Sequence, residues 1–213
     1  MGNTVQADAT SRATNADLRH VRPLDAATGR VAALVLAAGA GRRYGGPKAP
    51  TFLAQALRVL QDGGCDPVIA LLGAGARQTR AVVDLAGVEV VDNPGWAEGM
   101  ASSLRLGIST AARLPDVSAV CVHLVDMPGV SAAAVTRLLS RAHAGCLARA
   151  CYDGEPGHPV LLGRDHWARI VATARGDQGA RAYLRRHADD VIGVECGDVA
   201  AGYDVDERHG PDQ

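Results

Sequence analysis

The sequence has few aromatic residues and almost no net charge. Phe, Trp and Tyr make up 3% of the 213 residues, and 22 basic residues interspersed with 23 acidic ones give a formal net charge of −1. Such a balance provides no basic surface for nucleic acid or for an anionic membrane, so neither is expected as a partner. A core with so little aromatic content must be built from Val, Leu and Ala.

Two further features are missing. No stretch approaches the roughly 18 consecutive apolar residues of a membrane span, and the first residues contain no apolar run typical of a signal peptide. The protein is therefore expected to be cytoplasmic. The five cysteines form no CxxC pair and no zinc-ligand spacing, which favours buried free thiols in a reducing compartment.

The length suits a single domain flanked by two tails. Residues 1–29 are polar and rich in Ala, Thr, Asp and Arg, and we expect them to be disordered. Residues 30–207 carry the regular pattern of a folded domain. Residues 208–213 have no apolar anchor and are expected to fray. No internal repeat or linker divides the central range.

Strand and helix patterns alternate along this domain. Apolar runs predict strands over 31–36, 67–72, 88–91, 119–125, 146–152, 159–162 and 191–195. Helical spacing predicts helices over 52–60, 76–86, 102–113, 131–143, 165–173 and 180–187. This order predicts an α/β fold, namely a single-domain, doubly wound, mostly parallel sheet with helices on both faces.

A glycine-rich segment, GAGRRYGGPK over 39–48, follows the first predicted strand. Its four glycines let backbone N–H groups approach an anion, and Arg43 and Lys48 add two cations. A dinucleotide fingerprint would need glycine at position 44, where the chain has Tyr44. A Walker A loop would need Ser or Thr after the lysine, but Ala49 follows it. The segment therefore predicts a polyphosphate site of another kind, against the alternative of a surface turn with stray basic residues.

The same segment resembles the signature loop of the MobA/MocA-like nucleotidyltransferases, which transfer a nucleoside monophosphate from an NTP to a phosphorylated acceptor such as molybdopterin. The resemblance covers residues 31–206 and implies a Rossmann-like nucleotidyltransferase fold that uses Mg²⁺. Loop residues implied to bind the nucleotide are Leu36, Ala37, Ala38, Gly39, Gly41, Arg43 and Lys48. Arg43 and Lys48 are implied to act in catalysis by neutralising phosphate charge, together with Asp126.

Downstream segments extend the resemblance. Residues 93–104 resemble the segment that passes over the nucleobase, which implies base contacts by Gly99 and Ser103. The residue types alone favour helix capping by the serines there. Asp126, which ends a predicted strand, is implied to bind the metal, although by itself it reads as a turn cap. Asp204 and Asp206 resemble the pair that supplies a second metal carboxylate, and the choice between them stays open.

Two more motifs point to the acceptor. Gly157-His158-Pro159 and the GDQGAR stretch at 176–181 resemble segments of the cytidylyltransferase branch, which implies acceptor contacts by His158, Asp177 and Arg181. Without the resemblance, His158 would be a solvated loop residue and Arg181 a helix-surface charge. The chain also lacks the loop that the family normally has between the lysine and its next helix, so the acceptor's identity stays open.

The base preference and the activity are further expectations. Ala37-Ala38-Gly39 matches the cytidylyl branch, and a methyl group at position 38 would crowd a purine, which favours CTP. Met127 is closer to guanylyl members and favours GTP. The leading prediction is an Mg²⁺-dependent cytidylyltransferase. Two alternatives stay open: an oxidoreductase of this fold that acts on nicotine-derived dyes, and a non-catalytic maturation partner of a molybdoenzyme.

Overall fold

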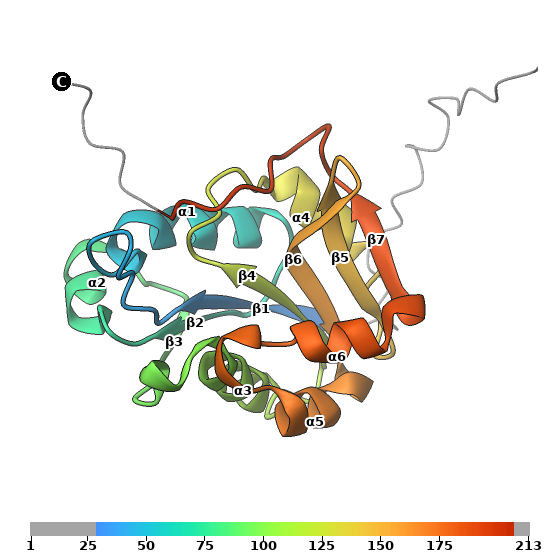
Figure 1. Cartoon of the computed structure of the whole chain (residues 1–213), viewed down its shortest axis with the longest axis horizontal. Helices are drawn as coiled ribbons and strands as arrows, with labels where there is room; N and C mark the ends of the chain where they lie inside the picture. The colour runs from blue at the N-terminus through green and yellow to red at the C-terminus, as the bar shows by residue number, and fades with distance from the viewer. Residues whose placement is uncertain (1–28, 207–213) are drawn as a thin grey trace, which may run out of the picture.

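The computed structural model describes residues 29–206, in which a seven-stranded sheet lies between two layers of helices (Figure 1). The tails predicted at the two ends lie outside the described residues, apart from Gly29. The strands are β1 (Arg30–Ala37), β2 (Val68–Leu72), β3 (Glu89–Asp92), β4 (Val117–Leu124), β5 (Leu147–Tyr152), β6 (Glu155–Gly163) and β7 (Val191–Glu195). The helices are α1 (Ala49–Asp62), α2 (Ala76–Val82), α3 (Met100–Ala111), α4 (Ala132–Leu139), α5 (Arg164–Thr173) and α6 (Arg181–Arg186), with 3₁₀ turns η2 (Trp96–Glu98), η3 (Gly176–Gln178) and η4 (Ala188–Asp190).

The strand order is β3-β2-β1-β4-β6-β5-β7. β1 lies between β2 and β4 and is parallel to both, while β6 is antiparallel to β4 and to β5. The mostly parallel, doubly wound sheet predicted from the sequence is confirmed. Helices α1 and α4 cover one face, and α3, α5 and α6 cover the other (Figure 1).

The central strand β1 shows why the sheet is buried on both faces. Its residues from Val31 to Ala37 are all buried, as the continuous apolar run predicts. Because side chains alternate along a strand, Val35 packs into the α1–α4 layer and Leu34 into the α3–α5–α6 layer. Each buried aliphatic side chain of this size contributes about 1.5–3 kcal/mol to the hydrophobic stabilisation.

The ends of several elements differ from the predictions. Helix α3 begins at Met100 instead of residue 102, and helix α1 begins at Ala49 instead of residue 52. Ser131 is the predicted cap of α4, and its side chain accepts from the N–H of Ala134. All five cysteines are free, and four of them are buried, as the free-thiol prediction requires.

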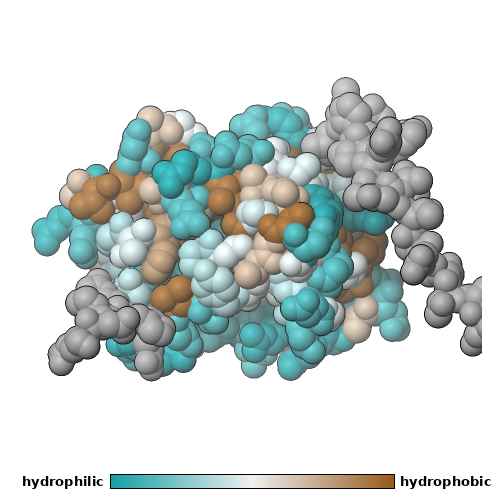
Figure 2. Space-filling model, turned by 90° about the horizontal axis from the view of Figure 1, so that it is seen from above, coloured by the Kyte–Doolittle hydropathy of each residue, from teal (hydrophilic) through white to brown (hydrophobic). Residues whose placement is uncertain are grey.

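The face that α1 and α4 cover mixes hydrophilic residues with small, separate hydrophobic patches (Figure 2). None of the helices within residues 29–206 is long and apolar enough to cross a membrane.

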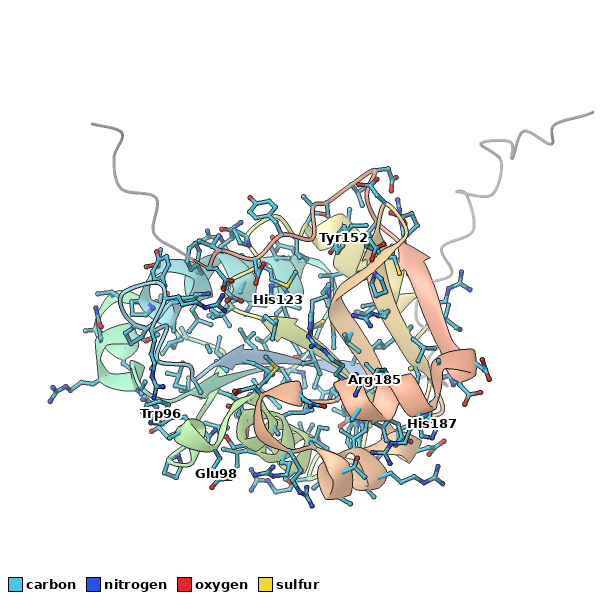
Figure 3. The ribbon with its side chains drawn as sticks, viewed as in Figure 1. Trp96, Glu98, His123, Tyr152, Arg185 and His187 are labelled. Carbon is cyan, nitrogen blue, oxygen red and sulfur yellow. The ribbon has the colours of Figure 1, made fainter. Side chains whose placement is uncertain are left out.

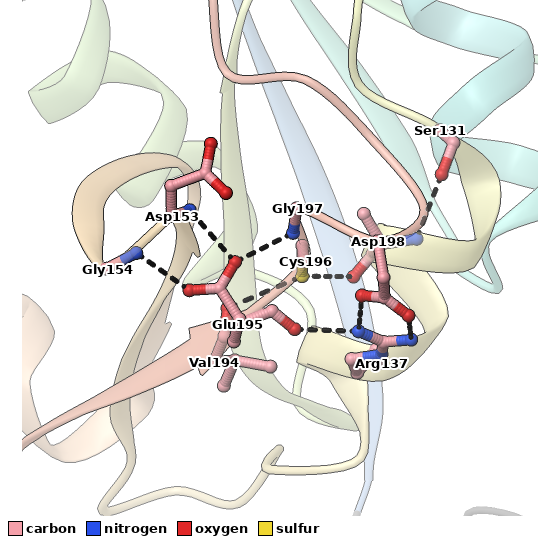
Figure 4. Close-up of polar contacts among 10 residues, drawn as sticks. Ser131, Arg137, Asp153, Gly154, Val194, Glu195, Cys196, Gly197 and Asp198 are labelled. Atoms are coloured by element: carbon pink, nitrogen blue, oxygen red, sulfur yellow. Dashed lines mark hydrogen bonds and ion pairs between the residues drawn. The ribbon is translucent and has the colours of Figure 1, made fainter.

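After β7 the chain turns back along the top of the sheet, and Glu195 fixes the start of this return (Figure 4). Its carboxylate accepts hydrogen bonds from the backbone N–H groups of Gly197, Gly154 and Asp153 at 2.8–3.1 Å. These bonds, led by that from Gly197, hold the pKa of Glu195 below its ordinary value of 4.5. One carboxylate thus ties the β5–β6 turn to the returning segment.

Three further contacts fix the position of the segment after β7. Arg137 of α4 forms two parallel hydrogen bonds with the carboxylate of Asp198 (Figure 4). The Ala201 N–H donates to the carbonyl of Gly129, and the Val205 N–H donates to the carbonyl of Asp126, both at 2.9 Å. Residues 203–206 therefore lie beside the end of β4.

His123 of β4 is a polar residue inside the core. Its side chain is 2% exposed, lies between the sheet and α1 (Figure 3), and has no hydrogen-bond partner for Nδ1 among residues 29–206. Burial, and then the neighbouring His158, lower the pKa of His123 from 6.5 to about 3. Burial likewise lowers the pKa of His158 to about 4. Both imidazoles are therefore neutral in the folded protein at pH 7.

The free energy of unfolding should fall as the pH drops from 7 to 5. In this range the unfolded chain protonates both histidines and the folded chain does not, so each lowers stability by at most about 1.4 kcal/mol per pH unit. His123→Leu removes one of these groups together with an unpartnered buried nitrogen. Its stability at pH 7 should equal or exceed that of the wild type, and its pH slope should be smaller.

Urea unfolding at pH 7 and pH 5 measures both quantities. His143→Asn, at an exposed position, is the matched control. An unchanged slope in His123→Leu would show that His123 titrates normally in the folded state.

Candidate nucleotide-binding site

The glycine-rich loop joins β1 to α1 at the end of the sheet where the parallel strands finish. Gly41 has φ 58°, and a Cβ there would collide with the carbonyl oxygen of Gly46, so the turn requires glycine. The Gly46 N–H donates back to the Gly41 carbonyl at 3.0 Å. Lys48 immediately precedes α1, so the loop ends at the positive end of that helix's dipole.

Four charged side chains meet beside this loop. Lys48 Nζ lies 2.7 Å from Asp126 Oδ2 and 3.5 Å from Asp206 Oδ1. Arg43 Nη1 lies 2.7 Å from the other oxygen of Asp206. The Lys48 and Asp126 side chains are only 13% and 20% exposed, so water and salt screen this pair weakly. Asp206, and not Asp204, is the late carboxylate that approaches Asp126.

Lys48 is the only lysine in the chain, although the sequence has 22 basic residues. Lysine presents a compact ammonium group, whereas arginine presents a planar fork. The ammonium here lies between two carboxylates and 6.0 Å from the centre of the buried Tyr44 ring. Tyr44 itself packs against Phe52 of α1, with ring centres 5.7 Å apart.

The charged cluster forms one wall of a pocket with a volume of about 420 Å³. Trp96, at the loop end of the sheet (Figure 3), and the start of α3 form the opposite wall. The pocket is lined by all nine residues predicted to bind the nucleotide: Leu36, Ala37, Ala38, Gly39, Gly41, Arg43, Lys48, Gly99 and Ser103. Their roles as nucleotide contacts remain predictions.

The two serines of α3 do not cap the helix, which corrects the expectation from residue type. Because the helix begins earlier, Gly99 is the N-cap, and both hydroxyls lie inside the first turn. The buried Asn93 amide donates to Ser102 Oγ at 2.8 Å and to Ser103 Oγ at 2.9 Å. Ser102 donates in turn to the Gly99 carbonyl. Within the described hydrogen bonds Ser103 Oγ only accepts, so its proton is available to a ligand.

Asp177 closes the pocket from the side of η3. Its Oδ1 accepts from the Met100 N–H at 3.3 Å, at the N-terminus of α3. Gly99 has φ 101°, and a Cβ at this position would collide with Asp177 and with the backbone of Gly176. Asp177, predicted to contact the acceptor, therefore fixes the start of α3 and lines the boundary between two pockets.

A second pocket, of about 350 Å³, lies on the other side of that boundary. It contains His158, Arg181 and Asp204, so the structure brings the predicted acceptor residues together and places Asp204 with them. His158 Nδ1 lies 3.4 Å from the Val122 carbonyl. A carbonyl can only accept, so this contact favours the tautomer that leaves Nε2 as an acceptor facing the pocket.

Several residues of the site were not predicted from the sequence. Tyr44 and Trp96 line the first pocket, Arg149 lines the second, and Asn93 holds the two serines from outside the pocket linings. Asn93 and Trp96 lie in the 93–104 segment that resembles the one over the nucleobase, but no role was assigned to them. Arg149 left a signal of its own, because it is a charged residue inside the otherwise apolar strand run LARACY.

The fold is that of nucleotidyltransferases, and the comparisons specify the family. Residues 33–191 match the model of the MobA-like NTP transferase domain, and the chain belongs to this family. Membership supports nucleotidyl transfer as the general activity.

Several relatives cover most of the chain. A nicotine blue oxidoreductase from Paenarthrobacter nicotinovorans is 35% identical over 190 residues, which are 83% of this chain and 92% of that protein. The structure of Rv0371c from Mycobacterium tuberculosis in complex with manganese superposes with a TM-score of 0.68 at 27% identity, covering 83% of this chain and 94% of that one. A nucleotidyl transferase from Methanothermobacter shares the fold, with a TM-score of 0.66 at 20% identity over 78% of this chain and 87% of that one.

Replacing Asn93 by Ala should lower the free energy of unfolding by about 2–4 kcal/mol, because two buried hydrogen bonds and one partly buried one lose a partner. It should also weaken nucleotide binding, since Ser103 loses the contact that orients it. Chemical denaturation measures the first effect and calorimetry the second. Ser109→Ala, on the exposed side of the same helix, is the control and should change neither. A loss below about 0.5 kcal/mol in Asn93→Ala would contradict the proposed role of the amide.

Proposed function

We propose that this protein transfers a nucleoside monophosphate from an NTP to an acceptor and releases pyrophosphate. The observation that carries the proposal is the cluster of Lys48, Arg43, Asp126 and Asp206 in the lining of the first pocket. Two cations beside a loop of backbone N–H groups suit a triphosphate, and two carboxylates beside them suit a metal ion.

Mg²⁺ would be held by Asp126 and Asp206. Both carboxylates lie within 3.5 Å of the same ammonium nitrogen, so they face one point in the pocket. Within residues 29–206 no three acidic, His or Cys side chains gather to hold a metal. Mg²⁺ is often bound by one or two carboxylates plus substrate phosphates and water, so this pair of oxygen ligands fits it. The manganese in the Rv0371c complex supports a divalent cation on this fold. When bound, the cation neutralises charge on the phosphates.

The chain's own residues bind and orient the reactants. An acceptor oxygen attacks the α-phosphorus, a new P–O bond forms, and the bond to the bridging oxygen of the β-phosphate breaks as pyrophosphate leaves. Lys48 and Arg43 neutralise the negative charge on the phosphates, and the loop N–H groups fix their position. An anionic phosphate acceptor needs no base, so His158 serves in binding.

The proposed nucleotide is CTP. Ala38 is buried and lines the pocket, and it packs against Gly73 beside Trp96, so its methyl group narrows the space for the base. The hydroxyl group of Ser103 can donate a hydrogen bond to a carbonyl group of the base, and cytosine has such a carbonyl. The proposed acceptor is phosphorylated, with molybdopterin as one example, and it would contact His158 and Arg181.

A second candidate function is oxidation or reduction of a dye. It is favoured by the relative named nicotine blue oxidoreductase, which matches along most of both chains. Reduction of nicotine blue by NADH or NADPH, followed by its absorbance, tests this candidate directly.

Mg²⁺ and CTP together should bind more tightly than Mg²⁺ with GTP, ATP or UTP. Lys48→Ala should lose most of this affinity and all detectable transfer, because the phosphates lose a cation, and circular dichroism should show that the fold survives the loss of the ion pair with Asp126. Lys48→Arg keeps the charge but replaces the compact ammonium by a fork, and it should recover only part of the affinity. Calorimetry with the four nucleotides measures binding. Tighter binding of GTP would overturn the base preference, and no binding of any nucleotide would overturn the proposed function.

Asp206→Asn should weaken Mg-CTP binding, whereas Asp204→Asn should leave it unchanged. The two positions are two residues apart, but only Asp206 lies in the first pocket near Lys48. Asn keeps the shape of the side chain and removes the charge that attracts Mg²⁺. Titration with Mn²⁺ followed by paramagnetic relaxation, with and without CTP, reports on the cation directly. Equal effects of the two substitutions would remove Asp206 from the metal site.

A further inference from the structure

The second pocket contains a guanidinium group with no carboxylate partner among residues 29–206. Arg149 lies on β5, and its Nη2 donates to the carbonyl of Gly157 at 3.1 Å. Its Nε is buried and has no hydrogen-bond partner in residues 29–206. Burial lowers the pKa of Arg149, which shows that the protein holds this charge where water solvates it poorly. A buried N–H of a cation without an acceptor lowers the stability of the fold, unless a ligand accepts a hydrogen bond from it.

Arg181 of α6 lines the same pocket. It lies near enough to Arg149 to contribute to the lowering of that pKa. Within residues 29–206 neither guanidinium has a carboxylate at ion-pair distance, although six other basic side chains there, including Arg43 and Lys48, do. Two like charges facing one cavity repel each other, and an anion between them would remove the repulsion.

The two acidic residues of the pocket do not supply that anion. Asp177 is engaged with the Met100 N–H at the start of α3. Asp204 is exposed on the returning segment and forms no ion pair with a described residue. The neighbouring imidazole of His158 is neutral at pH 7, because burial lowers its pKa to about 4. The two carboxylates balance the two arginines in formal charge across the pocket lining, but within residues 29–206 neither lies at ion-pair distance from Arg149, so the local charge there is positive.

Most of the remaining wall is apolar. It includes Leu104, Val122, Leu124, Val160, Leu162 and Leu184. Burying hydroxyl groups against such side chains without hydrogen bonds is unfavourable, so a sugar-like body does not suit this wall. A ligand with an apolar or aromatic body suits this wall.

The second pocket adjoins the first. The two share Leu36, Met100, Leu124 and Asp177 in their linings, and Leu124 is the last residue of β4, two residues before Asp126. A molecule that fills the second pocket thus lies beside the cluster proposed to hold the triphosphate.

We propose that the second pocket binds an acceptor with one anionic group, a phosphate or a carboxylate, held between Arg149 and Arg181, and with an apolar body packed on the leucine and valine wall. This assignment rests on the proposed transferase function and names the chemical class of its acceptor. It adds Arg149 as a residue that determines acceptor specificity.

The test uses small probes of this class and the full chain with Mg-CTP present, so that the first pocket is filled. 1-Naphthyl phosphate and 1-naphthoate provide the two kinds of anion, while 1-naphthol and inorganic phosphate provide the body and the anion separately. Calorimetry should show that at least one naphthyl anion binds more tightly than both 1-naphthol and inorganic phosphate. Comparison of the phosphate with the carboxylate identifies the preferred anion.

Arg149→Gln and Arg181→Gln should each weaken binding of that probe about tenfold or more, because each removes a charged donor. Arg149→Lys keeps the charge and should lose less affinity for the probe than Arg149→Gln. Arg186→Gln, on the same helix but outside both pockets, is the matched control and should bind like the wild type. Arg181 is exposed, so its substitution tests the clamp even if Arg149→Gln fails to fold.

Equal probe affinity in the wild type and Arg181→Gln, or binding of 1-naphthol as tight as that of the anions, would overturn the proposal. Repeating the titration without nucleotide separates it from the transferase function. Probe binding that needs both arginines, in a protein that binds no NTP, would contradict nucleotidyl transfer and support the pocket's ligand class. NTP binding without probe binding would support the transferase function and contradict the proposed ligand class of the second pocket.

Discussion

The ion pair between Lys48 and Asp126 holds together the parts of the chain on which the site depends. It joins the loop after β1 to the end of β4, across 78 residues of sequence, and Asp206 brings in the returning segment from beyond β7. The scaffold places these three segments at one edge of the sheet, where the parallel strands end. Because the pair is only partly exposed, its charges act over a short distance with little screening. A triphosphate that enters the pocket would meet a charge arrangement already fixed by the fold.

Much of this arrangement could be predicted from the sequence, and the reasons are local. A strand buried on both faces reads as a continuous apolar run, and the glycines, arginine and lysine of the loop are contiguous with it. The choice between Asp204 and Asp206 could not be predicted, because both lie in a segment without regular structure. The position of this segment is fixed by the hydrogen bond from the Val205 N–H to the Asp126 carbonyl. The roles of Ser102 and Ser103 were misjudged because α3 begins two residues earlier than its apolar spacing indicates. The role of Arg149 could not be predicted either, because it depends on the second pocket, which forms only when β5 and β6 pack beside α6.

In the proposed function, the two pockets separate the recognition of the nucleotide from the recognition of the acceptor. The first is lined by the β1 loop and the start of α3, and the second by β5, β6 and α6, with Asp177 and Met100 at their boundary. Such a division allows one family to keep a phosphate-binding loop while the second pocket changes. A relative with an oxidoreductase name therefore does not conflict with membership, because function lies in particular sites and not in the fold.

The single lysine has a consequence for the chemistry of the whole molecule. Reagents that attack ε-amines, such as active esters, aldehydes and reducing sugars, find one such group among residues 1–213, and it lies in the first pocket. Modification of one ε-amine per molecule and obstruction of that pocket are therefore the same event. Attachment to a solid support through this ε-amine is hindered, because the Lys48 side chain is only 13% exposed and paired with Asp126. Immobilisation through the free thiols is hindered as well, because four of the five are buried.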